Sequence, residues 1–298
     1  MMSENFKFKV SDENTILSLS GGRTSGYKLN RTLADNNDSL PGNCLAVFEN
    51  TGKEKEATLE FIRDMGNNWD VDIVWLEYTG KKQYKQVDFE TANRNGDPFE
   101  QLIRDKSMYL PNAAQRLCTI GLKSVVMSLF CKDIGWDSIE NWVGIRADEP
   151  KRWGMEGVTY EKDKDGNTKY YADGVTPKRL NKIINEEKCL PMKYAGITKP
   201  DVLDFWKNND FDLALGPNES NCNLCFMKGV DNILSEIRLD PDSADWWIEM
   251  EDMCSNHHGK PVTFRPDRPS YRKLKQIAHE QPDFFIGDTN NIPCHCTD

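Results

Sequence analysis

The sequence lacks the features of a membrane or secreted protein. Its longest apolar runs, such as residues 125–131, are far too short to cross a bilayer. The first ten residues, MMSENFKFKV, do not contain the apolar stretch of a signal peptide. We therefore expect a soluble globular protein that stays in the cytoplasm and contacts no membrane. In that compartment its nine cysteines need a role other than disulfide formation.

The chain also has fewer basic than acidic residues. The 298-residue chain has 38 lysines and arginines against 48 aspartates and glutamates, and its net charge at pH 7 is −10. A surface with this balance is not suited to holding long nucleic acid without sequence preference. Contact with nucleic acid would need a local basic cleft, so the composition leaves that class of partner open.

Strand-like and helix-like segments alternate in the first half of the chain. Residues 15–19 (TILSL), 44–48 (CLAVF) and 72–78 are predicted strands, and residues 27–34 and 54–65 are predicted helices. This alternation indicates an α/β fold, with helices on both faces of a twisted parallel sheet. Further helices are predicted at residues 99–108, 122–132 and 198–207, and a further strand at residues 137–145.

The composition divides the chain into three predicted regions. Residues 1–150 form the α/β domain, and residues 189–298 form a mainly helical region with several cysteines. Between them, residues 151–188 are strongly polar, and Asp165-Gly166 lies between two strand-like flanks. Since Asp-Gly is a strong hairpin signal, we predict an inserted surface hairpin there.

A glycine loop joins the first predicted strand to the first predicted helix. In the run Ser-Gly-Gly-Arg-Thr-Ser-Gly at residues 20–26, several backbone N–H groups would point at one spot, which suits a phosphate. The glycines let the main chain approach an anion, and the hydroxyls of Ser20, Thr24 and Ser25 are further donors. It is not a Walker loop, because the Gly-Lys-Ser/Thr ending is missing. An ordinary strand-to-helix turn is the alternative interpretation.

Five segments in succession resemble one family of enzymes. SLSGGRTSG is similar to the pyrophosphate-binding (PP) loop of the adenine nucleotide α-hydrolase superfamily. The four segments that follow it resemble successive parts of the phosphoadenosine phosphosulfate (PAPS) reductase family, and all five occur in the family's order. They are VFENTGKEKEATLEFI, LPNAAQRLCTIGLK, VGIRADEPKR and LPMKYAGITKPDVLDFWKNNDFDL.

The resemblance implies an enzyme that binds an adenine nucleotide, either a sulfonucleotide such as PAPS or ATP with Mg²⁺. Asn50 stands where many members of the family have aspartate, which puts coordination of Mg²⁺ at that position in doubt. The family's phosphate and adenine contacts carry over to Ser20, Gly21, Gly22, Arg23, Thr24, Ser25, Phe48 and Asn50.

Three basic residues carry over to the anionic end of the substrate. Lys123 and Arg146 are the predicted catalytic cations, and Arg152 is a further candidate. A guanidinium group can clamp phosphate or sulfate through two hydrogen bonds. The alternative interpretation of each of these residues is a solvated charge on the protein surface.

Cys222 and Cys225 form a Cys-x-x-Cys pair, a spacing that suits two ligands of one metal centre. The resemblance implies a [4Fe–4S] cluster held by Cys118, Cys222 and Cys225, with Cys294 or Cys296 as the fourth ligand. Zinc is the rival occupant, and His295 lies between the two tail cysteines. Thiols without a metal are the third interpretation. Cys44, Cys131 and Cys189 are predicted buried packing residues, and Cys254, near His257 and His258, is a predicted loop residue.

Two reactions fit these features. In the first, a thiol attacks the sulfur of a sulfonucleotide and releases sulfite and AMP or its 3′-phosphate, with Cys296 as nucleophile and a thioredoxin-like thiol donor. The tail IPCHCTD differs from the family's C-terminal Glu-Cys-Gly-Ile/Leu-His motif. The identity of the nucleophilic cysteine is therefore an open question. In the second, ATP adenylates a nucleobase or small molecule, and sulfur then displaces AMP. A non-catalytic nucleotide-binding module with a structural metal is the third hypothesis, and a homo-oligomer is compatible with all three.

Overall fold

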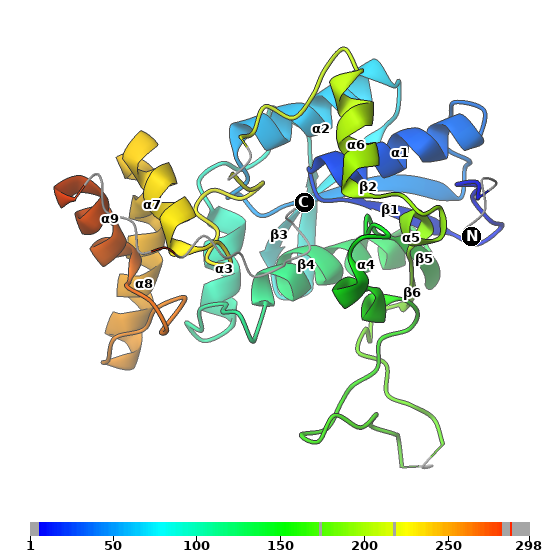
Figure 1. Ribbon diagram of the computed structural model, residues 1–298. Helices are drawn as coiled ribbons and strands as arrows, with labels where there is room; N and C mark the ends of the chain where they lie inside the picture. Colours follow the sequence, from blue (N-terminus) through cyan, green and yellow to red (C-terminus); the bar gives the residue numbers. More distant parts are fainter. Residues whose placement is uncertain (1–5, 173–174, 217–218, 282–286, 288–298) are drawn as a thin grey trace. The chain divides into compact units, whose positions relative to one another are not determined.

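The computed structural model describes residues 6–172, 175–216, 219–281 and 287. It contains a six-stranded sheet with strand order β4-β3-β2-β1-β5-β6 (Figure 1). β1 runs parallel to β2 and β5, β5 runs parallel to β6, and β4 is antiparallel to β3. The predicted α/β fold class is therefore confirmed. The strands are β1 (Thr15–Leu19), β2 (Cys44–Asn50), β3 (Ile73–Gly80), β4 (Gln83–Val87), β5 (Ser138–Trp142) and β6 (Asn185–Cys189).

Helices separate most of the strands and make up the C-terminal part, as the sequence predicts. No helix in the described ranges has both the length and the apolar character needed to cross a membrane. The α-helices are α1 (Arg23–Asp35), α2 (Glu56–Asn68), α3 (Asp97–Asp105), α4 (Val125–Asp133), α5 (Pro191–Tyr194), α6 (Lys199–Lys207), α7 (Val230–Leu239), α8 (Asp245–His258) and α9 (Tyr271–Glu280). Shorter helices are the π-helix η1 (Cys118–Ser124) and the 3₁₀ helices η2 (Pro150–Met155) and η3 (Pro241–Ala244).

The chain forms two compact units, each assembled from separate segments. The three regions predicted from composition, in contrast, follow one another along the sequence. Unit 1 consists of Met1–Phe48, Ile62–Val74 and Met127–Asp212. Unit 2 consists of Glu49–Phe61, Trp75–Val126 and Leu213–Asp298.

In unit 1, β1 and β2 are buried on both faces. Ile16 and Leu17 of β1 and Ala46 and Val47 of β2 have no exposed surface, which explains why both strands are mainly apolar in the sequence. Helix α1 lies beside α6 (Figure 1). A side chain at Gly26 of α1 would begin 2.7 Å from the Trp206 ring of α6, so glycine permits this close packing.

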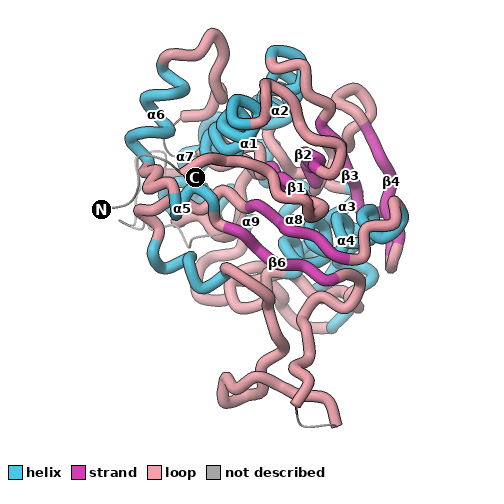
Figure 2. Tube along the Cα trace, turned by 90° about the vertical axis from the view of Figure 1, so that its right-hand side faces the viewer, coloured by secondary structure: helices cyan, strands magenta, loops and turns pink. Residues whose placement is uncertain are grey.

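The polar segment between η2 and β6 projects away from β6 in both views (Figures 1 and 2). It contains the predicted turn, in which Gly166 has a φ of +86° and its N–H donates to the Asp163 carbonyl over 3.1 Å. An isolated β-bridge joins Lys162 and Thr168 on the two sides of the turn. The prediction that the insertion extends to residue 188 is wrong at its end, because residues 185–189 form β6 and pair with β5.

In unit 2, α7, α8 and α9 pack around an aromatic core. The Trp247 ring of α8 lies 4.9 Å from the Phe264 ring and 5.1 Å from the Tyr271 ring of α9. Trp247 is 1% exposed and is therefore part of this core. The buried Tyr271 hydroxyl donates to the Leu224 carbonyl over 2.6 Å, so this core also fixes the Cys-x-x-Cys segment.

Candidate functional site

The glycine loop of unit 1 is a tight strand-to-helix connection. β1 ends at Leu19 and α1 begins at Arg23, so the helix starts inside the predicted phosphate loop rather than at Tyr27. Gly21 has a φ of +81°, a conformation that favours glycine. The N-cap is Gly22, which offers no side-chain oxygen to the first N–H groups of the helix. The first N–H groups of α1 therefore have no side-chain cap, a feature of helix N-termini that bind anions.

The loop hydroxyls hold the loop together. The Ser25 hydroxyl donates to the Gly22 carbonyl over 2.8 Å and accepts the Ser20 N–H over 3.2 Å. Both Thr24 and Ser25 are buried. The hydroxyl of Ser25 thus shapes the loop, in addition to the donor role that its position in the motif predicts.

Arg146, one of the predicted catalytic cations, lies against this loop. It follows β5 and is 6% exposed, and its Nη1 donates to Thr24 Oγ1 over 2.7 Å. Its Nε lies 3.0 Å from Asp148 Oδ1 and its Nη2 lies 3.7 Å from Glu149 Oε2. Burial acts to raise the pKa of Asp148, but hydrogen bonds from the Lys199 N–H and the Arg146 guanidinium outweigh it and lower that pKa. The cation is therefore held rigidly at the loop.

Other predicted contacts in unit 1 have further partners. Arg23 Nε pairs with Asp212 over 2.7 Å, and Arg152 Nη1 pairs with Glu149 over 2.6 Å. Phe48 has no exposed surface. Of the predicted residues of this unit, the structure brings Arg146 and the loop residues together most directly.

Lys28 is a residue of this site that sequence reasoning missed. It has no exposed surface, and its Nζ donates to the Ser18 carbonyl over 2.8 Å and to the Trp142 carbonyl. It thereby ties α1 to the ends of β1 and β5, the two strands beside the loop. No local pattern in the sequence marks Lys28, because its burial depends on carbonyl partners in β1 and β5.

In unit 2, the turn after β2 is held by buried polar groups. The Asn50 amide donates to Glu77 Oε1 over 2.6 Å and to the Asn93 carbonyl over 2.8 Å, and its Oδ1 accepts the Gly52 N–H over 3.1 Å. Asn50 has no exposed surface. These bonds give Asn50 a structural role at the turn, and its nucleotide contact stays a prediction.

Glu54 is the second residue that sequence reasoning missed. Its Oε2 accepts both the N–H and the hydroxyl of Thr51 over 2.8 Å. Its Oε1 lies 3.8 Å from Cys222 Sγ and 3.9 Å from Lys123 Nζ. The Thr-x-x-Glu pattern of a capping box was the available signal. Glu54 therefore connects a predicted metal ligand with a predicted catalytic cation.

Three predicted metal ligands share one cavity in unit 2. Cys118, Cys222 and Cys225 line a space of about 30 Å³, together with Lys123 and seven other residues. Two backbone hydrogen bonds bring the Cys-x-x-Cys segment to the turn after β2, from Lys55 N–H to the Asn221 carbonyl and from Asn223 N–H to the Lys53 carbonyl, each 2.7 Å. Thiols from three positions thus meet in one small, mainly apolar space.

The three thiols of this cavity are suitable metal ligands, but their positions are not those of a metal-binding group. Within the described part of the chain, no group of three or more histidine, cysteine, aspartate or glutamate side chains is arranged to hold a metal ion. Metal binding would therefore have to draw the three thiols together. Cys294 and Cys296, the predicted fourth ligand and nucleophile, lie outside the described residues.

Most of the other cysteines have the environments of packing residues. The loop prediction for Cys254 is wrong, because Cys254 is buried within helix α8. Burial raises the pKa of the Cys44 thiol to about 12 and that of the Cys254 thiol to about 11, so neither is an activated nucleophile. Cys131 has no exposed surface, while Cys189, predicted to be buried, is partly exposed. His258 is exposed, and its Nε2 lies 3.1 Å from the Met108 carbonyl oxygen.

Comparison with known proteins finds a relative of uncharacterized function. No family model matches the chain. The chain is similar to an uncharacterized nin region protein, ORF290, of Escherichia phage lambda, with 28% identity over 228 residues, which is 73% of this chain and 67% of the relative. The name of that protein states no reaction or ligand. The resemblance to the PAPS reductase family therefore stays a prediction.

Proposed function

We propose that this protein is an enzyme that binds the phosphates of an adenine nucleotide at the loop of residues 20–25. One observation carries the proposal: the buried guanidinium of Arg146 lies 2.7 Å from Thr24 Oγ1, in the first turn of α1. A helix N-terminus capped by glycine favours an anion, and a fixed guanidinium beside it adds charge-assisted hydrogen bonds. Neither group alone would support a phosphate site as well as the two together.

The reaction we propose is thiol-dependent reduction of a sulfonucleotide. A thiolate attacks the sulfur, the bond from sulfur to the phosphate oxygen breaks, and AMP or its 3′-phosphate leaves. A second thiol then displaces sulfite, and the two thiols become a disulfide. The PAPS reductase resemblance favours Cys296 as the first thiol and a thioredoxin-like protein as the source of reducing equivalents. Since these thiols must stay reduced, we place the reaction in the cytoplasm.

We also propose a metal centre at the cysteine cavity. Cys118, Cys222 and Cys225 would be its ligands, with Cys294 as the fourth. Thiolates suit both an iron–sulfur cluster and zinc, and the resemblance favours [4Fe–4S]. Such a centre supplies a structural link between these chain segments when it is bound. Lys123, near Glu54, would supply positive charge to the anionic end of the substrate.

The test is incubation of anaerobically purified protein with PAPS and a dithiol, and separately with ATP and Mg²⁺. Release of sulfite is the expected result. Pyrophosphate and AMP from ATP would instead identify adenylation, and tight nucleotide binding without any product would identify a binding module. Either outcome would overturn the reductase proposal.

Binding is tested by titrating the nucleotide into loop variants. Gly22→Val should abolish binding, because a side chain there would intrude on the amides of the loop. Gly42→Val is the matched control, since a side chain at Gly42 has no heavy atom within 4 Å. Unchanged affinity in Gly22→Val would count against the phosphate site itself.

A further inference from the structure

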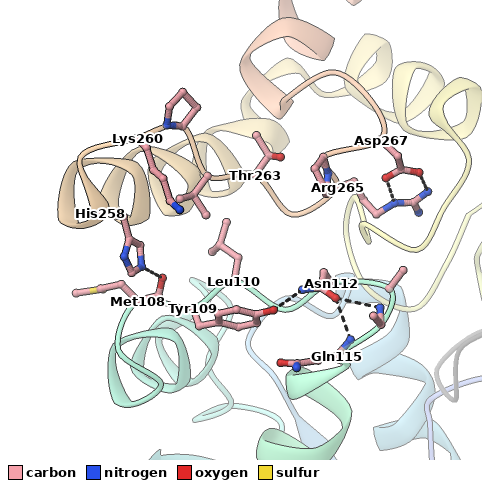
Figure 3. A pocket seen from close by; sticks show the side chains of 15 residues that line it. Met108, Tyr109, Leu110, Asn112, Gln115, His258, Lys260, Thr263, Arg265 and Asp267 are labelled. Carbon is pink, nitrogen blue, oxygen red and sulfur yellow. Dashed lines mark hydrogen bonds and ion pairs between the residues drawn. The ribbon is translucent and has the colours of Figure 1, made fainter. Parts of the chain in front are cut away.

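A large groove in unit 2 is not used by the proposed reaction. It has a volume of about 780 Å³, within the range of roughly 300–1,000 Å³ that is typical of ligand sites (Figure 3). One wall is the connection between α3 and η1, residues 108–115. The other wall is the connection between α8 and α9, residues 258–267.

The walls of the groove carry a small excess of basic residues, unlike the chain as a whole. Residues 108–115 and 258–267 contain the basic residues Lys260 and Arg265 against the acidic residue Asp267, whereas the whole chain has a net charge of −10. On an acidic protein, such a place is more favourable to an anion than the surrounding surface.

The cations of the second wall differ in how they are held. Arg265 pairs with Asp267 over 2.7 Å, and Arg268 donates to the Lys228 carbonyl over 2.6 Å, so both help to fix the wall. Lys260 is exposed and makes no ion pair within the ranges that the structure covers. Its ammonium group extends toward the wall that carries Leu110 (Figure 3). Lys260 is therefore the cation available to a ligand.

The first wall presents a fixed aromatic ring. Tyr109 is 42% exposed, and its hydroxyl accepts a hydrogen bond from the Asn112 amide over 3.0 Å. Asn112 Oδ1 in turn accepts the Ala114 and Gln115 N–H groups over 3.0 and 2.9 Å, which holds the loop that orients the ring. An exposed ring held in one orientation is a platform on which a flat base can stack.

Hydrogen-bonding groups complete the lining. The Gln115 side-chain amide and the Thr263 hydroxyl also line the groove. An amide can read the edge of an unpaired base, and a hydroxyl can bind a phosphate or sugar oxygen. The combination of a ring, an amide and an ammonium group is that of a site for unpaired nucleotides.

We propose that this groove binds a short single-stranded segment of nucleic acid. A base stacks on Tyr109, and a backbone phosphate lies at Lys260. The acidic surface elsewhere repels the remainder of the strand, so binding is confined to the groove. A duplex fits less well because its bases are already stacked on one another.

The test measures fluorescence anisotropy of labelled oligothymidylate and oligouridylate strands at low salt. We expect binding by the full chain, about tenfold weaker binding by Tyr109→Ala and by Lys260→Ala, and a shallower salt dependence for Lys260→Ala. Lys207→Ala is the matched control, because Lys207 is an exposed lysine of unit 1. Circular dichroism of each variant verifies folding.

Three results would overturn the proposal. They are absence of binding by the full chain, equal affinity in the groove variants and the control, and displacement of the strand by free AMP as effective as by unlabelled strand. ATP titrations separate this proposal from the phosphate site. Gly22→Val should leave strand binding unchanged, and Lys260→Ala should leave ATP binding unchanged.

Discussion

At the scale of single residues, the arrangement around Arg146 combines a cation with two carboxylates. Asp148 and Glu149 offset its charge, so the guanidinium is held in place without being buried alone. A bound phosphate would therefore be stabilised more by the fixed hydrogen-bond donors of Arg146 than by its positive charge. This makes the shape of the guanidinium more important than its charge.

The first prediction follows from that shape. Arg146→Lys keeps the positive charge but loses the fork that reaches Thr24 and Asp148, so nucleotide affinity should fall about tenfold, or ~1.4 kcal/mol. Isothermal titration with the nucleotide measures it. Arg179→Lys, an exposed arginine of the same unit, should bind as the parent does. Equal binding by both variants would remove Arg146 from the site.

The second prediction concerns Glu251, a buried carboxyl of α8. Burial raises its pKa from 4.5 to about 7, although it accepts the Tyr271 N–H over 3.0 Å and the Phe264 N–H over 3.2 Å. Between these two pH values the folded chain holds a proton that the unfolded chain has lost. The free energy of unfolding should therefore decrease as pH rises from 4.5 to 7, by up to about 3 kcal/mol.

Glu251→Gln removes that proton exchange and should flatten this part of the stability profile. Urea titrations of both proteins at several pH values measure the slope. The absolute stability of the variant matters less than the slope, because glutamine also changes one hydrogen bond. Parallel profiles for the two proteins would show that Glu251 does not titrate in this range.

At the scale of elements, α1 is fixed to the sheet by a buried charge. Lys28→Met should destabilise the protein by roughly 2–4 kcal/mol, because the carbonyls of Ser18 and Trp142 lose a charged donor. Urea unfolding measures the change. Lys207→Met, at an exposed position of α6, should change stability by less than about 0.5 kcal/mol. A small effect at Lys28 would mean that water replaces the donor.

The elements that sequence predicts well are those buried on both faces. β1 and β2 appear as apolar runs, whereas the edge strands β4 (QYKQV) and β6 (NEEKC) are polar and were missed. In β6 the buried Glu186 accepts from the Asn141 amide over 2.8 Å, a partner that only the folded chain supplies. The helix predicted at residues 99–108 ends at Asp105, since Ser107 and Met108 are left-handed.

The same limit applies to the candidate site. Glycine spacing and the Cys-x-x-Cys pair are local patterns, so the strand-to-helix loop and the pairing of Cys222 with Cys225 could be predicted. The grouping of Cys118 with that pair was implied by the family resemblance, not by a local pattern. Lys28 and Glu54 are charged residues whose burial depends on distant partners. Composition treats such residues as surface, and only tertiary contacts identify them as part of the site.

At the scale of the whole molecule, a metal centre would join distant parts of unit 2. The chain between Cys118 and Cys222 spans about 100 residues, and closing such a loop restricts the unfolded chain. A ligand bound only to the folded state also stabilises it by mass action. Chelation should therefore lower the melting temperature of the metal-loaded protein.

The fourth prediction is that Cys222→Ser and Cys225→Ser each abolish bound metal. Elemental analysis for iron and zinc after anaerobic purification measures the metal content. Absorption of visible light distinguishes an iron–sulfur cluster from zinc. Cys189→Ser, at a partly exposed thiol, should retain the full metal content. A parent protein that carries neither element would refute the metal centre.

Helix α6 contacts the candidate phosphate site at two points. The Lys199 N–H at its start donates to Asp148 over 3.0 Å, and Trp206 Nε1 near its end donates to the Arg23 carbonyl over 2.8 Å. Indole emission is sensitive to the carbonyl that its N–H contacts. If an anion binds beside Arg23, we therefore expect the fluorescence of Trp206 to change with occupancy of the loop.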